Sequence, residues 1–270
     1  MRRYAGALFL VILLCSCQVP ELADGTADPP GDLVPGRVER VVDGDSVVLA
    51  TEDSDIEVRL MGINAPEQDE CHHQESRDHL AGLIGASIGL EVISTDQFDR
   101  TLAYVWIDDL LVNEDLVNGG FAIATTNPED GDPHGESLIA AEEGAFRAGA
   151  GVWSATVCGS LTRLPEISID ADGSVFDPSG PDDEVLDGEW VSLTSTETVD
   201  AGGWTIRDES SQHRCRLVPG TVITEENGLI VTSAHECWDP GNSSVWTNGG
   251  DMILVLDESG TVVARHRYSG

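Results

Sequence analysis

Hydrophobic and polar positions alternate over short runs in the first half of the chain, and Asp43–Gly44 between two of these runs is typical of a tight turn. Apolar residues recur at helical spacing in three other segments. The predicted strands are 37–42, 46–51, 56–61, 89–94 and 102–107. The predicted helices are 74–83, 113–117 and 134–148. Five strands with a few helices predict a mainly β fold with some α, a small Greek-key barrel of the OB type.

The second half changes to short strands separated by turn residues, which predicts a β-sandwich. The expected strands are 190–193, 203–207, 222–224, 229–233, 252–256 and 261–265. The change falls close to Gly159–Pro165. We therefore expect one domain over 34–158, a linker over 159–164 and a second domain over 165–270.

The N-terminus has the features of an export signal. Arg2 and Arg3 precede an apolar run too short to span a bilayer, and 1–16 is predicted to be a signal peptide. The run ends in Leu14-Cys15-Ser16-Cys17, which resembles the bacterial lipobox, and this resemblance implies acylation of Cys17. Residues 17–33 then form an acylated, flexible tether. We expect an exported protein anchored by lipid to the cell envelope, facing the periplasm or the exterior; the alternative is an ordinary secretory signal.

The charge of the chain limits the chemistry it can perform. There are 49 acidic residues against 14 basic ones, the net charge is −35, and every basic residue is arginine. Lysine chemistry, such as a Schiff base or a P-loop, is therefore excluded. The acidity is also the opposite of the usual footprint of a nucleic-acid binder. A solvated acidic surface adapted to salt is the preferred interpretation; a role in binding cations or basic partners is the alternative.

Four cysteines remain after the signal peptide, and an even number in an exported chain suggests two disulfides. Pairing within each expected domain gives Cys71–Cys158 and Cys215–Cys237, although the sequence alone leaves the connectivity open. A zinc site is the alternative for some of these positions, but its spacing matches no standard site. Its candidate ligands are Cys71, His72, His73 and His79.

Three motifs follow one another in the first domain. They are Val42-Asp43-Gly44-Asp45-Ser46, Arg59-Leu60-Met61-Gly62-Ile63-Asn64-Ala65-Pro66-Glu67 and Asp96-Gln97-Phe98-Asp99-Arg100-Thr101-Leu102-Ala103-Tyr104. In this order they resemble the signatures of the staphylococcal nuclease (thermonuclease) family. The resemblance covers roughly 34–158 and implies a Ca²⁺-dependent phosphodiesterase or endonuclease, a hydrolase acting on DNA, RNA or both.

The residue types suit that chemistry. Phosphodiester hydrolysis needs neutralisation of the charge that grows on the phosphoryl oxygens, and a positioned water. Asp45, the Asn64 side-chain oxygen and the Ala65 carbonyl are hard ligands that suit Ca²⁺. Arg59 and Arg100 are permanently charged donors for the phosphate. Glu67 can orient or deprotonate the water. The resemblance implies these same roles for Asp45, Asn64, Glu67, Arg59 and Arg100.

Two departures from the family pattern bear on substrate and metal affinity. Asn64 stands where the best-studied members carry Asp, which removes one negative charge from the expected metal site. Thr126 stands at the position of a phosphate-contacting Tyr, and the lysine-rich rim of the family is absent. Asp43 is expected only to cap the hairpin turn.

The second domain contains motifs that resemble the lamin-tail family, an immunoglobulin-like sandwich. These motifs include Asp187-Gly188-Glu189-Trp190 and Gly202-Gly203-Trp204. Glu189, Trp190 and Trp204 are expected to be structural, and no catalytic constellation is visible in this half. Besides the nuclease, two alternatives stay open: a catalytically inactive surface module that binds nucleic acid or envelope partners, and a structural Ca²⁺-binding envelope protein. No obligate protein partner is evident.

Overall fold

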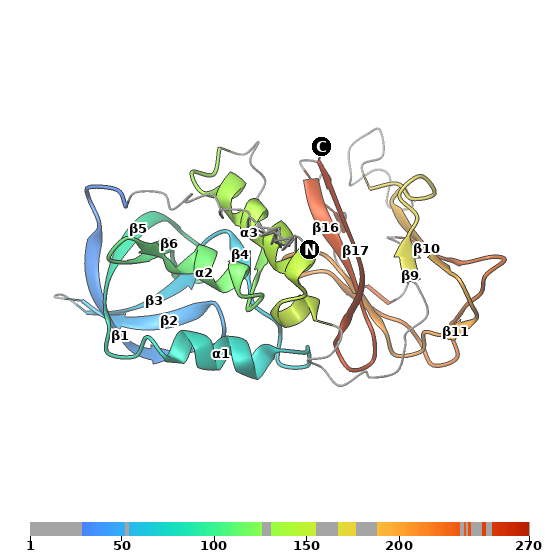
Figure 1. Cartoon of the computed structure of the whole chain (residues 1–270), viewed down its shortest axis with the longest axis horizontal. Coiled ribbons are helices and arrows are strands. Elements are labelled where there is room, and N and C mark those ends of the chain that lie inside the picture. The colour runs from blue at the N-terminus through green and yellow to red at the C-terminus, as the bar shows by residue number, and fades with distance from the viewer. Residues whose placement is uncertain are drawn as a thin grey trace, which may run out of the picture.

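The computed structural model describes most of the chain after the N-terminal segment, and its two β-rich halves lie side by side (Figure 1). The described residues are 29–51, 54–125, 131–154, 167–176, 188–232, 235, 237–238, 245–246 and 250–269. The expected signal peptide, the acylated Cys17, Thr126 and the linker over 159–164 lie outside them. Among the described residues, no helix combines the length and the apolar character that crossing a bilayer demands.

The first half is a closed five-stranded barrel, as the sequence predicts. Its strands are β1 (Val34–Val41), β2 (Ser46–Ala50), β3 (Asp55–Leu60), β5 (Ser87–Thr95) and β6 (Thr101–Ile107). They follow the order β3-β2-β1-β5-β6, and parallel pairing of β3 with β6 closes the barrel. The short β7 (Leu110–Leu111) extends the sheet beyond β6. Large side chains fill the interior, among them Leu49, Leu60, Leu90, Tyr104 and Trp106.

Helices cover the barrel and lead towards the second half. The helices are α1 (His73–Ala81), α2 (Val112–Asn118), α3 (Gly135–Ala148) and the 3₁₀ turn η2 (Gly151–Trp153). In α3, Leu138 and Ala145 are buried on one face, as the helical spacing predicts. Gly149 ends α3 in a left-handed conformation that glycine adopts at low cost. Two further short strands, β4 (Ile63–Asn64) and β8 (Ile123–Ala124), pair beside the barrel.

The second half consists of small antiparallel sheets around one core, which fits the expected immunoglobulin-like sandwich. One sheet has the order β15-β10-β9, with β9 (Ile167–Ile169), β10 (Trp190–Ser195) and β15 (Leu229–Thr232). A second has the order β13-β12-β16-β17, with β12 (Thr205–Arg207), β13 (Arg214–Arg216), β16 (Gly250–Leu256) and β17 (Val262–Ser269). The remaining pair is β11 (Val199–Asp200) with β14 (Val222–Ile223). Trp204 and Trp246 are buried in this core.

The two halves share a hydrophobic and ionic interface. Ile123 and Val152 of the first half form one buried cluster with Met252, Leu254 and Leu256 of β16. Figure 1 shows α3 between the barrel and the β16–β17 pair. Four arginines of the second half reach across the boundary: Arg207, Arg214, Arg265 and Arg267. The interface therefore fixes how the second half lies against the first.

Candidate active site

The turn between β1 and β2 delivers Asp45 to one end of the barrel. Asp43 accepts a hydrogen bond from the Asp45 N–H (3.1 Å), which is the turn-capping contact expected for Asp43. Gly44 is required by close packing, because a Cβ there would lie 2.6 Å from the Ala65 Cβ. The turn is thereby pressed against the loop that carries Asn64, Ala65 and Glu67.

Strand register brings Arg59 and Arg100 to this same end. In β3, Arg59 pairs with Ser46 of β2 and with Leu102 of β6. Arg100 directly precedes β6, whose first residue pairs with Val58. Closure of the barrel therefore unites side chains that lie far apart in the sequence.

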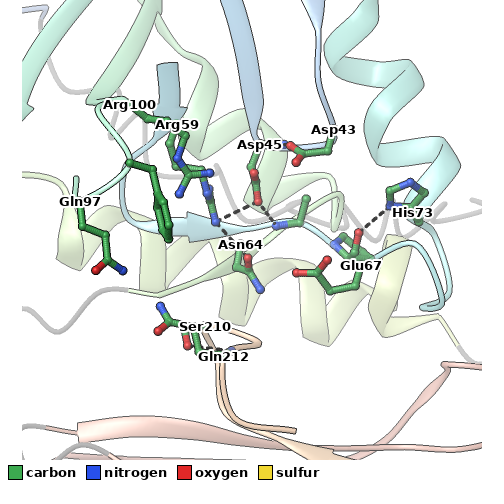
Figure 2. Close-up of a pocket in the computed structure, with 13 residues that line it drawn as sticks. Asp43, Asp45, Arg59, Asn64, Glu67, His73, Gln97, Arg100, Ser210 and Gln212 are labelled. Carbon is green, nitrogen blue, oxygen red and sulfur yellow. Dashed lines mark hydrogen bonds and ion pairs between the residues drawn. The ribbon is translucent and has the colours of Figure 1, made fainter. Parts of the chain in front are cut away.

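Arg59, Asp45 and Asn64 form a compact polar cluster (Figure 2). The Arg59 Nη2 lies 3.0 Å from the Asp45 Oδ2 and donates to the Asn64 Oδ1 at 3.0 Å. The Arg59 Nη1 donates to the carbonyls of Leu60 and Ile63. The Asp45 Oδ2 also accepts from the Ala65 N–H at 2.7 Å. Burial raises the pKa of Asp45 to about 7, with Asp43 adding to the effect and Arg59 opposing it.

The amide nitrogen of Asn64 is held by the second half of the chain. The Asn64 Nδ2 donates to the Glu209 carbonyl (3.1 Å) and to the Ser211 Oγ (2.8 Å). Both acceptors belong to the turn between β12 and β13. Asn64 is 4% exposed, so these contacts satisfy a buried amide.

Glu67 lies on the other side of the pocket, where its backbone is tied to a buried ion pair. The Glu67 N–H donates to the Glu70 Oε2 (3.2 Å), and the Glu70 Oε1 lies 2.8 Å from the Nε of Arg207. The side chains of Glu70 and Arg207 are 2% and 3% exposed. Desolvation and the nearby Glu70 carboxylate raise the pKa of Glu67. A raised pKa brings a carboxyl closer to the range useful for a general base.

Arg100 differs from Arg59 because most of its guanidinium remains available. The Arg100 Nε donates to the Asp96 Oδ2 at 2.8 Å, and the guanidinium lies 5.6 Å from the centre of the Phe98 ring. Among the described residues, no hydrogen-bond partner is found for its two terminal nitrogens. The Phe98 side chain is exposed. Arg100 can therefore donate to an incoming phosphate without breaking a contact to the protein.

All six predicted site residues line one pocket of about 370 Å³ (Figure 2). They are Asp45, Arg59, Asn64, Ala65, Glu67 and Arg100. Asp43 and Pro66, from the first two motifs, also line it. The other lining residues, which the sequence did not assign to this site, are His73, Gln97, Phe98, Ser210 and Gln212. Gln97 and Phe98 lie within a motif and could have been found by their proximity to Arg100. Ser210 and Gln212 come from the second half, and no local pattern points to them.

The donor set of this pocket fits a hard divalent cation. Asp43, Asp45 and Glu67 bring carboxylates to the pocket, and Asn64 and Ala65, which line it too, each have a neutral oxygen of the kind that Ca²⁺ takes as a ligand. Asp43 raises the pKa of both Asp45 and Glu67, which means that these carboxylates repel one another. A bound cation would relieve that repulsion.

The other cysteine and histidine predictions have mixed outcomes. Cys215 and Cys237 are joined by a disulfide, with their Cα atoms 4.7 Å apart. Cys71 is disulfide-bonded, but its expected partner Cys158 lies outside the described residues. Within the described part of the chain, the alternative zinc ligands His72, His73 and His79 form no metal-binding cluster with Cys71. His73 instead contacts the Pro66 carbonyl and His79 pairs with Asp115.

Comparisons with known proteins find similarity in the first half of the chain. A model of the staphylococcal nuclease homologue family matches residues 57–155. Protein ParB of Escherichia coli is 29% identical over 139 residues, which are 47% of this chain and 77% of ParB. An uncharacterized endonuclease of Haemophilus influenzae is 31% identical over 120 residues, 44% of this chain and 65% of that protein, slightly less than two thirds of its length. Thermonuclease of Staphylococcus intermedius is 27% identical over 126 residues, 43% of this chain and 74% of the enzyme.

The match lies on the part of the chain that forms most of the barrel, α1, α2 and α3. The matched region includes five of the six predicted site residues. The sixth, Asp45, lies twelve positions before its start. The chain thus carries a staphylococcal-nuclease-like domain, and its relatives support a nuclease function.

Proposed function

We propose that the chain is a Ca²⁺-dependent nuclease that hydrolyses phosphodiester bonds of DNA, RNA or both. The observation that carries this proposal is the pocket itself, which gathers carboxylates, a buried amide and two arginines at one end of the barrel. A module that only bound nucleic acid would have no need of Glu67 beside these arginines.

The residues of the pocket have different roles in this proposal, according to their position and charge. Arg100 presents free guanidinium nitrogens to the phosphate, and Arg59 keeps Asp45 and Asn64 together. Asp45, Asn64 and the Ala65 carbonyl would hold the cation, whose chemical contribution is to polarise the phosphoryl oxygen and neutralise its charge. Glu67, whose pKa is raised, accepts a proton from the attacking water.

The test is cleavage of single-stranded DNA by residues 18–270, with Ca²⁺ or with EDTA. Arg100→Ala and Glu67→Gln are the informative variants. Arg40→Ala and Glu57→Gln are matched controls, because both positions are exposed on barrel strands outside the pocket. We expect Ca²⁺-dependent cleavage that falls about 10²–10³-fold in Arg100→Ala. Comparable rates in the two variants and their controls would leave the pocket without a catalytic role.

We further propose that the protein is exported and anchored by a lipid on Cys17. The support is the charged start, the short apolar run and the Leu14-Cys15-Ser16-Cys17 segment. In a bacterial host, Cys17→Ser should abolish labelling with a fatty acid, whereas Cys15→Ser should keep it. Equal labelling of the two variants would refute the anchor. The likeness of the second half to lamin-tail domains remains a prediction from the sequence motifs.

A further inference from the structure

The turn between β12 and β13, residues Asp208–His213, reaches from the second half into the nuclease pocket. Ser210 and Gln212 line the pocket, and Figure 2 shows them facing Asn64 from the opposite ribbon. The turn contacts Asn64 through two acceptors, the Glu209 carbonyl and the Ser211 hydroxyl. Because an amide has distinct donor and acceptor ends, this contact directs the Asn64 Oδ1 towards Arg59.

The turn is itself firmly held. Asp208 accepts hydrogen bonds from the Ser210 Oγ (2.6 Å) and pairs with the His213 Nδ1 (2.9 Å). The Glu209 Oε2 lies 2.8 Å from the Nη1 of Arg267. Ser211 has φ = 61°, a left-handed conformation that a non-glycine residue adopts only when its surroundings impose it. The Ser211 Oγ is thus presented to Asn64 at the expense of backbone strain.

A second link joins the same two parts of the molecule. Arg207, the last residue of β12, forms the buried pair with Glu70, and Glu70 accepts the Glu67 N–H. Asn64 and Glu67 stand at the two ends of one four-residue segment, 64–67. Both of its ends are therefore held by residues 207–211 of the other half, directly at Asn64 and through Glu70 at Glu67.

From these contacts we infer that the second half of the chain is part of the catalytic apparatus: Ser211 and Arg207 are positioning residues that fix Asn64 and Glu67. The inference rests on the proposed function and adds to it a dependence of the nuclease site on the second domain. It also accounts for Asn64: an aspartate has no N–H to give to the Glu209 carbonyl, whereas the asparagine donates to both acceptors.

Ser211→Gly separates positioning from stability. Glycine adopts a positive φ without strain, and this gain offsets part of the cost of the lost hydrogen bond to the buried Asn64 amide, so this variant should unfold at a temperature close to that of the wild type. It also removes the hydroxyl that Asn64 binds. Loss of such an outer contact typically lowers metal affinity or activity about 10–100-fold. We expect a fall of at least about tenfold in kcat, measured from initial rates, or in Ca²⁺ affinity, measured by calorimetry, both on the full chain.

The Arg207 link is tested with two double variants, each of which removes ion pairs that join the two halves. Glu70→Met/Arg207→Met removes the acceptor of the Glu67 N–H without leaving a lone buried charge. Arg265→Met/Glu143→Met is the control, because it removes the pairs of Arg265 with Glu143 and Glu142, which also join the two halves but lie on α3, outside the pocket. Glu142 keeps its pair with Arg267 in this control. If the ion pairs serve only to hold the two halves together, both double variants will change kcat alike. If positioning matters, only the first will lower kcat, by about tenfold or more.

The outcomes separate this inference from the proposed function. An active wild type whose kcat and Ca²⁺ affinity are unchanged in Ser211→Gly and in Glu70→Met/Arg207→Met would overturn the inference and keep the nuclease. A wild type that binds Ca²⁺ without cleaving would refute the nuclease, and the Ca²⁺ affinity of Ser211→Gly would then decide the positioning of Asn64. A wild type that neither cleaves nor binds Ca²⁺ would overturn both.

Discussion

Arg59 and Arg100 both line the pocket, but their guanidinium groups differ in what they already bind. Arg59 donates to two backbone carbonyls and contacts Asp45 and Asn64, whereas Arg100 uses its Nε on Asp96. Arg59→Ala should therefore lower the free energy of unfolding by about 3 kcal/mol, because it leaves the buried Asp45 carboxylate without the guanidinium that pairs with it. Arg100→Ala should change it by less than about 1 kcal/mol while lowering kcat. Thermal unfolding measures the stability of the two variants, and initial rates measure their kcat. Equal losses of stability in the two variants would contradict the different roles of the two arginines.

The amide of Asn64 leads to a second prediction at the residue scale. Asn64→Asp restores the carboxylate of the family pattern, but it places a charge beside the Glu209 carbonyl, which cannot donate to it. In EDTA the variant should unfold at a lower temperature than the wild type, by roughly 2 kcal/mol of stability. Ca²⁺ should then raise its unfolding temperature by more than it raises that of the wild type. An Asn64→Asp protein as stable as the wild type in EDTA would show that the amide contacts contribute little.

At the scale of elements, the first half could be predicted closely from the sequence. Its long strands and helices begin and end within a few residues of the expected positions, because turn residues and apolar periodicity mark them. The expected strand over 203–207 is shorter, since Gly203 has φ = 86° and β12 begins at Thr205. Two- and three-residue strands such as β4, β8 and β13 have no periodicity to detect. Yet β4 carries Asn64, and β13 follows the turn that holds it.

The turn between β12 and β13 contains the pair of His213 with Asp208, and the contribution of His213 to stability depends on pH. The hydrogen bond from His213 to Asp208 raises the pKa of His213, with Asp251 and Glu189 adding to the effect and burial opposing it. The unfolded value is near 6.5, so the stabilisation is fully present below pH 6.5 and is lost as the pH rises through the raised pKa. His213→Gln should therefore destabilise the protein more at pH 5.5 than at pH 9, by about 1 kcal/mol. Chemical denaturation at the two pH values measures this, and a loss independent of pH would contradict it.

At the scale of the whole molecule, the sequence indicated two halves but not how they meet. The motifs in 43–100 place all six predicted site residues, because their order along the chain determines which strand ends lie next to one another. The contacts of Asn64 with Glu209 and Ser211 join residues 145 and 147 positions apart, and no pattern encodes them. The arginines show the same limit. Arg207, Arg214, Arg265 and Arg267 serve the interface, so few positive charges remain to attract a polyanion.

The net charge of −35 then governs how nucleic acid approaches the pocket. Repulsion between the protein and a polyphosphate is screened by salt, because the Debye length falls from about 30 Å at 0.01 M to about 8 Å at 0.15 M. At saturating Ca²⁺, kcat/KM on single-stranded DNA should rise several-fold over this range, the reverse of the fall that counterion release gives a basic protein. A single phosphodiester with a chromogenic leaving group is the control, since its one charge is repelled far less. A steady fall of kcat/KM on DNA with added salt would mean that the local field of Arg59 and Arg100 outweighs the acidic surface.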